Sequence, residues 1–405
     1  MSLDLADLYR GLHAHPELAF AETRTAGIAA RLLRDLGLEV TTGVGGTGVV
    51  AVLENGDGPV VALRADMDGL PVEERTGLDY ASTVRTVGSD GEDVPVMHAC
   101  GHDVHVTCLV GAVEDLVARR STWSGTLVAV VQPAEELVAG ARAMVDDGLV
   151  ERFPRPHVVL GQHVAPLPAG IVALRPGPAM ASSDTLTVTF HGRGGHGSRP
   201  QTTVDPLLTA CHAVVRLQSI VSRETEPGEV VVVSVGAIHA GTADNIVPAE
   251  ATISVNVRAV TAQSRSRVLA AVHRIVEAEA AAAGMTTPPT VVESKAAPAT
   301  TNDPAATARV RATFVETFGE AAVVDPGIVS GSEDVGAIAA AADAPLVFWF
   351  LGGADPATFA AAAAAGTLDS DLPSNHSPHF APVVQPTLDV GVAALSAAAR
   401  EWLGR

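Results

Sequence analysis

Hydrophobic and polar positions in the first 160 residues follow two alternating periods. Short apolar runs rich in β-branched residues have the length of buried strands, and they lie at residues 49–53, 60–63, 126–131 and 157–160. Between them are stretches with helical spacing, at residues 3–36 (interrupted near His15-Pro16), 103–119 and 135–147. Strands that alternate with helices in this way predict a largely buried α/β sheet.

The pattern changes near residue 182. Residues 185–190 alternate polar and apolar side chains, as a half-exposed strand does. The elements expected after it are a helix at 205–223, strands at 230–237 and 251–258, and an Ala-rich helix at 261–284. Together these elements predict a small α+β domain.

The first pattern returns after a Pro/Thr/Ala-rich stretch at residues 287–302. Buried strands such as 346–350 again alternate with long helices, and the run Ala360–Ala365 predicts a helical turn or a surface loop. We therefore expect a discontinuous domain formed by residues 1–181 and 294–405. A second domain, residues 182–293, is inserted into it.

Composition narrows the functional class. The chain has 405 residues with 26 Lys and Arg against 46 Asp and Glu, a formal charge of −20, and 3% aromatic residues. An acidic surface with few aromatic side chains disfavours nucleic acid as a partner. No apolar run of about 18 residues predicts a membrane span. Three cysteines without a pairing pattern and a first segment unlike a signal peptide indicate a cytoplasmic enzyme.

Several familiar motifs are absent or misleading. Gly43-Val-Gly-Gly-Thr-Gly48 matches G-x-G-x-x-G, but a strand-like run follows it where a dinucleotide site needs a helix. We expect a hairpin there. The sequence contains no G-x-S-x-G, no H-E-x-x-H and no Walker A loop.

Candidate chemistry is concentrated in Met97–His105, which holds three histidines, a cysteine and an aspartate. Thiolate and imidazole are favoured zinc ligands, so Cys100 and His102 are candidate ligands at a strand-to-helix turn. Asp103 is a candidate for a carboxylate that lies behind a metal-binding histidine and fixes its tautomer. The alternative is a buried cysteine among histidines that bind no metal.

Two further segments end a hydrophobic run in polar side chains, and a third candidate lies near the C-terminus. Glu135 and Glu136 follow one strand, so one carboxylate can bind metal while the other holds a water for hydrolysis. Taken alone, such a pair is more typical of a helix N-terminus. His163 follows another strand and His376 lies near the C-terminus. Together with Cys100 and His102 these residues supply enough ligands for two metal ions.

The inserted domain has its own candidates. Gly192–Gly197 surrounds His196 with glycines, and Asn245 and Arg258 follow. A histidine, an amide and a guanidinium on a separate domain suit a lid that binds a substrate carboxylate and an oxyanion. Spacing alone favours a simpler interpretation, a glycine-rich hairpin with ordinary surface polar residues.

The motifs, in their order along the chain, resemble the M20 family of metallopeptidases and amidohydrolases. The most similar branch is that of hippurate hydrolases, N-acyl-amino-acid amidohydrolases and auxin-conjugate hydrolases. The motifs that carry the resemblance are His13-Ala-His-Pro-Glu17-Leu, Arg64-Ala-Asp-Met-Asp68-Gly-Leu-Pro71, Met97-His-Ala-Cys-Gly-His-Asp103, Gln132-Pro-Ala-Glu-Glu136, Gly194-Gly-His196, Asn245-Ile-Val-Pro248, Ser332-Glu-Asp334 and His376-Ser-Pro378.

The resemblance implies an α/β catalytic domain with a mixed sheet flanked by helices, and an inserted α+β lid that also forms a homodimer. It implies a binuclear metal centre in which Cys100 bridges and Glu135 is the general base. His196 would stabilise the oxyanion, while Asn245 and Arg258 would contact substrate. The remaining implied ligands are His102, Glu136, His163 and His376.

The implied reaction is hydrolysis of the amide of an N-acyl-amino acid, a small-molecule substrate. Softness favours zinc, with manganese, cobalt or nickel as other candidates. A di- or aminopeptidase of the same fold and a non-catalytic metal-binding protein are the alternatives. Gln201, Val335 and the stretch around Ala360–Ala365 depart from the family pattern, which leaves the acyl group and the amino acid open.

Overall fold

The computed structural model describes residues 3–88 and 90–404 and divides into two compact units. Unit 1 comprises residues 3–179, Thr301–Gly327 and 334–404, and unit 2 comprises Met180–Thr300 and Ile328–Glu333. The boundary expected between residues 293 and 294 falls inside strand β15 (Thr290–Ala297). Because this strand pairs with β10 (Ser183–His191), the compact unit continues beyond it.

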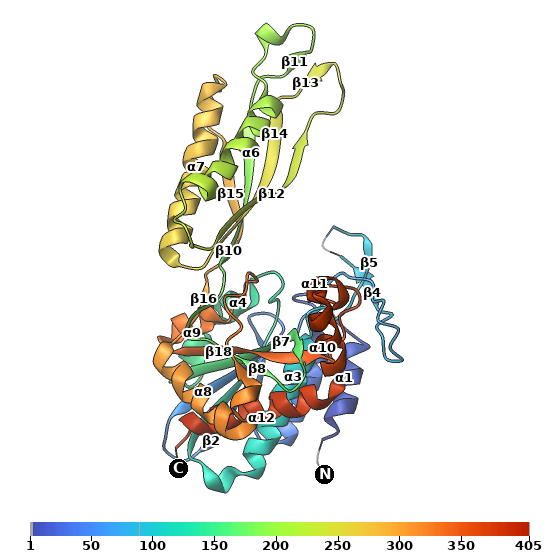
Figure 1. Cartoon of the computed structure of the whole chain (residues 1–405), viewed down its shortest axis with the longest axis vertical. Helices are drawn as coiled ribbons and strands as arrows, with labels where there is room; N and C mark the ends of the chain where they lie inside the picture. Colours follow the sequence, from blue (N-terminus) through green and yellow to red (C-terminus); the bar gives the residue numbers. More distant parts are fainter. Residues whose placement is uncertain (1–2, 89, 405) are drawn as a thin grey trace. The chain divides into compact units, whose positions relative to one another are not determined.

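Unit 1 is built on a mixed eight-stranded sheet (Figure 1). Strands β6, β3, β7 and β18 run parallel at its centre, and β1 and β2 form an antiparallel hairpin at one edge. The order across the sheet is β1 (Glu39–Val44), β2 (Gly48–Asn55), β6 (Gly125–Gln132), β3 (Val60–Asp66), β7 (Val158–Pro168), β18 (Leu346–Ala354), β8 (Val172–Ala173) and β17 (Val323–Val324). The hairpin confirms that the glycine-rich segment is not a dinucleotide loop.

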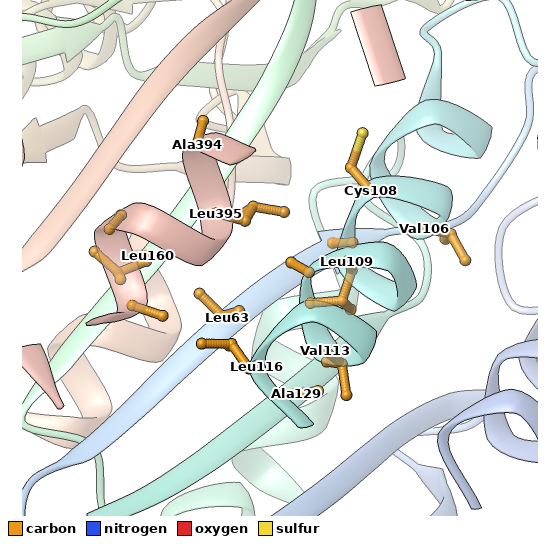
Figure 2. Close-up of a cluster of buried hydrophobic side chains, with 14 of the residues drawn as sticks. Leu63, Val106, Cys108, Leu109, Val113, Leu116, Ala129, Leu160, Ala394 and Leu395 are labelled. Carbon is orange, nitrogen blue, oxygen red and sulfur yellow. The ribbon is translucent and has the colours of Figure 1, made fainter. Parts of the chain in front are cut away.

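Helices pack against both faces of this sheet, which confirms the predicted class. The main core lies between the sheet and α1 (Leu5–His13), α2 (Thr23–Asp35), α3 (His102–Ala118), α8 (Pro304–Phe318) and α12 (Val384–Trp402). Figure 2 shows Leu109 and Leu116 of α3 beside Leu63 of β3 and Leu395 of α12, all buried. The shorter helices α4 (Gly140–Asp146) and α9 (Gly336–Ala342) also pack on the sheet.

Unit 2 has a four-stranded antiparallel sheet covered by two helices. Its strand order is β12 (Val231–Ala240), β14 (Glu250–Ala259), β10 and β15, and its helices are α6 (Pro206–Arg223) and α7 (Ala262–Ala282). Leu186, Val188 and Phe190 alternate along β10 and are buried beneath the helices, as the sequence pattern predicts. Strand β15 was missed because its residues lie within the Pro/Thr/Ala-rich stretch.

Two predicted elements have different bounds. The helix expected from residue 135 begins only at Gly140, because Ala134 (φ 49°) and Val138 (φ 55°) adopt left-handed conformations that a helix does not allow. The strand expected to end before His163 continues through it to Pro168. The alanine run forms the end of a helix, α10 (Pro356–Ala365). Within the described residues, no helix is long and apolar enough to cross a membrane.

The remaining short elements connect these layers. They are β4 (Arg85–Val87), β5 (Asp93–Pro95), α5 (Leu149–Arg152), β9 (Gly177–Met180), β11 (Gly195–His196), β13 (Ile246–Val247), β16 (Thr300–Asn302) and α11 (Leu368–Asp371), with 3₁₀ turns at Arg120–Thr122, Pro200–Thr202 and Glu320–Ala322.

Candidate metal centre

Parallel strands bring the polar segments of unit 1 together. Strands β3 and β6 are paired in parallel up to Asp66 and Gln132, so the residues that follow them leave the sheet at the same edge. Asp68 follows β3, and Glu135 and Glu136 follow β6. Carboxyl ends of parallel strands are where open α/β sheets bind their ligands.

The turn before α3 places Cys100 and His102. Gly101 between them has φ +82°, and a Cβ at this position would clash with the side chain of Val164. Only glycine fits this conformation and this close approach without strain. Both Cys100 and His102 are buried.

The predicted ligands of unit 1 converge. The donor atoms of Cys100, His102 and His163 lie within 4.8 Å of one another, as do those of Cys100, Glu136 and His376. A third such group is His102, Glu135 and Glu136. Cys100 belongs to two of these groups, which is the position expected of a residue shared between two ions.

Asp68 organises this cluster. Its Oδ1 accepts a hydrogen bond from the backbone N–H of Glu135 (3.1 Å) and lies 3.2 Å from Nδ1 of His102. Its Oδ2 accepts from the backbone N–H of Glu136 (3.0 Å). One buried carboxylate therefore fixes the glutamate turn and the orientation of a candidate ligand ring, as carboxylates behind metal ligands do.

The other ring nitrogen of His102 makes no hydrogen bond within the described residues. Nε2 is buried and has no hydrogen-bond partner among the described residues, although Oδ2 of Asp66 is 3.7 Å away and Glu135 and Glu136 each place an oxygen 3.9 Å away. These distances are too long for hydrogen bonds. A buried imidazole nitrogen facing three carboxylates fits a cation between them, so the residues present suit a metal ion.

The electrostatics of the cluster also favour cations. Burial opposes a charge on His102, but the Asp66 carboxylate and the bond to Asp68 raise its pKa well above the usual value. Contacts with Cys100 and Glu136 raise the pKa of His376 to about 10. Burial, together with the charge of Glu136, raises the pKa of the Cys100 thiol. A divalent ion would displace these protons, so its binding depends on pH.

His163 is held as a neutral ring that could serve as a metal ligand. Its Nδ1 donates to the carbonyl of Val164 (2.8 Å), so Nε2, which lies 3.4 Å from the Cys100 sulfur, keeps its lone pair. Burial, and then the neighbouring His105, lower the pKa of His163 well below its usual value.

His105 connects this strand to β3. Its Nε2 accepts from the backbone N–H of Val164 (2.8 Å), so its Nδ1 carries the hydrogen that bonds to Asp66. Asp66 is in turn bound by the buried guanidinium of Arg64 (2.7 Å). This chain of contacts fixes the strand that carries His163.

His376 approaches the cluster from the C-terminal part of the chain. It has φ +70°, its backbone N–H donates to the carbonyl of Ala99 (2.8 Å), and its Nε2 lies 3.3 Å from Oε2 of Glu136. The preceding Asn375 donates to the carbonyls of Cys100 (3.2 Å) and Val164 (3.1 Å). The loop is thus bonded to the segments that carry Cys100 and His163.

One sequence expectation is wrong. Asp103 fixes the tautomer of no candidate ligand, because its Oδ2 lies 2.6 Å from Nδ1 of His13. Adjacent residues of a helix point in different directions, so Asp103 cannot share the side of His102. The orienting carboxylate is Asp68, which lies in one of the family motifs but was not predicted to be part of the site. The signal for it was its place directly after a strand parallel to that of Glu135.

The candidates of unit 2 are only partly brought together. His196 is exposed, its backbone pairs with Ile246, and its Nδ1 lies 2.9 Å from the hydroxyl of Ser198. Asn245 is adjacent, because its carbonyl accepts from the N–H of Gly197 (2.8 Å). Asn245 lies just before the start of β14, whereas Arg258 lies near the C-terminal end of that strand, roughly 25 Å from its start. There it bonds to Asn256 and to the carbonyl of Ser330.

Two residues that depart from the family pattern lie outside this cluster of unit 1. Gln201 is exposed in the turn Pro200–Thr202, and Val335 is fully buried before α9.

The profile of peptidase family M20/M25/M40 matches residues 62–374. The chain belongs to this family. The match includes nearly all of the cluster described above, from Asp66 to His163, and ends just before His376. Membership in this family makes the protein a hydrolase of amide bonds.

Relatives within the M20 family have several names. A hippurate hydrolase of Campylobacter jejuni is 42% identical over 266 residues, 65% of this chain and 66% of that protein. Thermostable carboxypeptidase 1 of Saccharolobus solfataricus is 35% identical over 353 residues, 86% of this chain and 85% of that protein. An N-acetylcysteine deacetylase of Bacillus subtilis is 37% identical over 283 residues, 69% and 71% of the two chains.

Solved structures agree with this M20 assignment. A putative aminohydrolase of methicillin-resistant Staphylococcus aureus has a TM-score of 0.83 at 29% identity, covering 98% of this chain and 96% of that one. A dinuclear metal-binding M20 peptidase of Bacillus subtilis has a TM-score of 0.76 at 28% identity and 98% coverage of both.

Proposed function

We propose that the protein is a metal-dependent amidohydrolase that cleaves N-acyl-amino acids into a carboxylate and a free amino acid. The observation that carries this proposal is the placement of Glu135 at the edge of a convergent set of thiolate, imidazole and carboxylate donors. Relatives named for hippurate and N-acetylcysteine hydrolysis support an N-acyl-amino acid as substrate.

The proposed ligands are Cys100, His102, Glu136, His163 and His376. The donor set fits two divalent ions, with zinc or manganese as the first candidates and cobalt or nickel as others. When bound, such ions polarise the acyl carbonyl and lower the pKa of water nearby. The dinuclear metal-binding relative supports a stoichiometry of two ions per chain.

Glu135 is the proposed general base. Its backbone is fixed by Asp68 and its side chain is nearly buried, with an oxygen 3.9 Å from His102. The carboxylate takes the proton of the attacking water while the new C–O bond forms. It then gives this proton to the departing amide nitrogen as the C–N bond breaks. Asp68 fixes the backbone that carries this carboxylate.

A panel of substrates tests the proposal. The purified chain, loaded with defined metals, would be given N-acetyl-, N-benzoyl-, indoleacetyl- and long-chain acyl-amino acids beside dipeptides with a free amino group. We expect release of amino acid from at least one N-acyl substrate at a higher kcat/KM than from any dipeptide. Turnover of dipeptides alone would favour the peptidase alternative, to which the carboxypeptidase relative also points.

Unit 2 is proposed to act as a lid and to form a homodimer. Strand β12 is an edge strand of its sheet, with Val232 and Ile238 exposed along it, and an exposed edge of this kind favours pairing with a second chain. His196 would stabilise the oxyanion, and Asn245 and Arg258 would contact substrate. Because roughly 25 Å of β14 separates Asn245 from Arg258 within one chain, the two cannot both reach the same substrate carboxylate from that chain. Light scattering should give twice the mass of the chain, and a monomer at working concentration would contradict the dimer.

A further inference from the structure

A second buried cluster of charges lies in unit 1, centred on His13. The ring of His13 is fully buried, with Nδ1 2.6 Å from Oδ2 of Asp103 and Nε2 3.1 Å from Oε1 of Glu74. Each ring nitrogen thus faces a carboxylate oxygen, and both can donate only if the ring is an imidazolium. Burial lowers the pKa of His13, but Asp103 and Glu74 outweigh it and raise the pKa to about 10.

Two aromatic rings and two further hydrogen-bond donors surround this cluster. The rings of Tyr9 and Tyr80 pack against His13 at centroid distances of 5.6 and 5.4 Å. Glu74 also accepts hydrogen bonds from the hydroxyl of Thr76 and from the backbone N–H of Ser82 (2.6 Å). The proposed reaction uses none of these groups.

The contacts of the cluster lead to the metal centre from two sides. Asp103 directly follows His102 at the start of α3, so His13 is bonded to the turn that carries one proposed ligand, and Glu74 is connected to that turn through His13. Arg75, which follows Glu74, contacts the loop that carries His376. Arg75 donates its backbone N–H to the carbonyl of Pro378 (2.8 Å), and its own carbonyl accepts from Nδ1 of His379 (2.8 Å).

We propose that Glu74 is a positioning residue that links the His102 turn to the His376 loop and so sets the spacing of the two sides of the metal centre. These two segments are far apart in the sequence. The His376 loop is more exposed than the other ligand segments, with 55% of the His376 side chain accessible. A loop of this kind needs an external support to hold a ligand at a fixed position.

This inference rests on the proposed metal centre, and it is tested by metal binding rather than by turnover. Glu74→Gln removes a carboxylate that accepts from His13, Thr76 and Ser82. We expect it to weaken the affinity for Co²⁺ by about tenfold, which is the lower end of the loss seen when residues that support metal ligands are replaced. The affinity would be measured by competition with a chelator. Glu73→Gln is the matched control, because Glu73 is the adjacent residue and its side chain is 64% exposed. It should change the affinity less than twofold.

A second pair of variants avoids the buried cluster. His379 is exposed, so His379→Ala should fold while losing the bond to Arg75. His379→Asn retains a side-chain N–H near the position of Nδ1. We expect His379→Ala to weaken Co²⁺ binding about threefold and to alter the visible spectrum of the cobalt-loaded protein, and His379→Asn to restore both.

The outcomes separate the two proposals. If the wild-type chain binds no Co²⁺, the proposed metal centre is wrong. If the wild type binds Co²⁺, and Glu74→Gln and His379→Ala bind it with the same affinity and give the same visible spectrum, then Glu74 does not position the ligands. This holds even if the melting temperature of either variant changes. Weaker binding with an altered spectrum, restored in His379→Asn, supports the role of Glu74.

Discussion

The clusters around His102 and His13 are similar in composition but differ in the hydrogen bonding of the histidine ring. Both are buried in unit 1, and both surround a histidine with carboxylates. In the His13 cluster each ring nitrogen lies within hydrogen-bond distance of an oxygen. In the His102 cluster Nε2 has no hydrogen-bond partner among the described residues, and the nearest carboxylate oxygens are 3.7–3.9 Å away. Burial and charge are common to both clusters, and a buried ring nitrogen without a hydrogen-bond partner in the described part of the chain distinguishes the His102 cluster from the His13 cluster.

The largest effect expected from this difference is on catalysis in the His102 cluster. Glu135→Gln keeps the size of the side chain but removes the base, so kcat should fall by about 10²–10⁴-fold. Metal content, measured by elemental analysis, should stay at the wild-type level because Glu135 is not among the proposed ligands. Glu54→Gln, at an exposed position, is the control. Undiminished hydrolysis by Glu135→Gln would show that another group is the base.

A smaller effect is expected where a carboxylate orients a ligand. Asp68→Asn loses an acceptor for the backbone N–H groups of Glu135 and Glu136 and for the ring of His102. Metal affinity should fall by about 10–100-fold, as measured by chelator competition. Asp57→Asn, in an exposed turn, should leave it unchanged. Equal affinities for the two variants would mean that the glutamate turn needs no support from Asp68.

A third effect is on the stability of the His13 cluster, and it depends on pH. The pKa of His13 rises from 6.5 to about 10 on folding, so its contribution to the free energy of unfolding is complete below about pH 6.5 and is lost as the pH rises towards 10. Denaturant unfolding of the wild type and of His13→Gln should show a stability difference that shrinks with pH. The slope is at most about 1.4 kcal/mol per pH unit. A difference that is constant between pH 6.5 and 10 would mean that His13 is neutral in the folded protein.

Much of the fold could be predicted because its strands are unambiguous. The runs at 49–53, 60–63 and 126–131 are apolar and β-branched, and each is a strand of the central sheet. Strand β15 could not be found from its residues. Most of its side chains are exposed and their pattern is weak, so its pairing with β10 is decided by tertiary contacts.

The candidate ligands were found from residue type, but the groups behind them were not. Cys100 and His102 stand out because cysteine and histidine are rare and clustered. Asp68 and His105 act through contacts between segments 34–67 residues apart, which no local pattern encodes. The assignment of Asp103 failed for the same reason, because its partner His13 lies 90 residues away.

The central claim is that the cluster shared by Cys100, His102, Glu136, His163 and His376 is a metal centre. Metal content and hydrolysis of N-acyl-amino acids, measured on the same samples of wild type and Cys100→Ala, test it most directly, because Cys100 belongs to two of the donor groups. We predict two ions per chain in the wild type, and in Cys100→Ala a marked loss of bound metal together with a loss of hydrolysis. Full metal occupancy and full activity in Cys100→Ala would contradict the account.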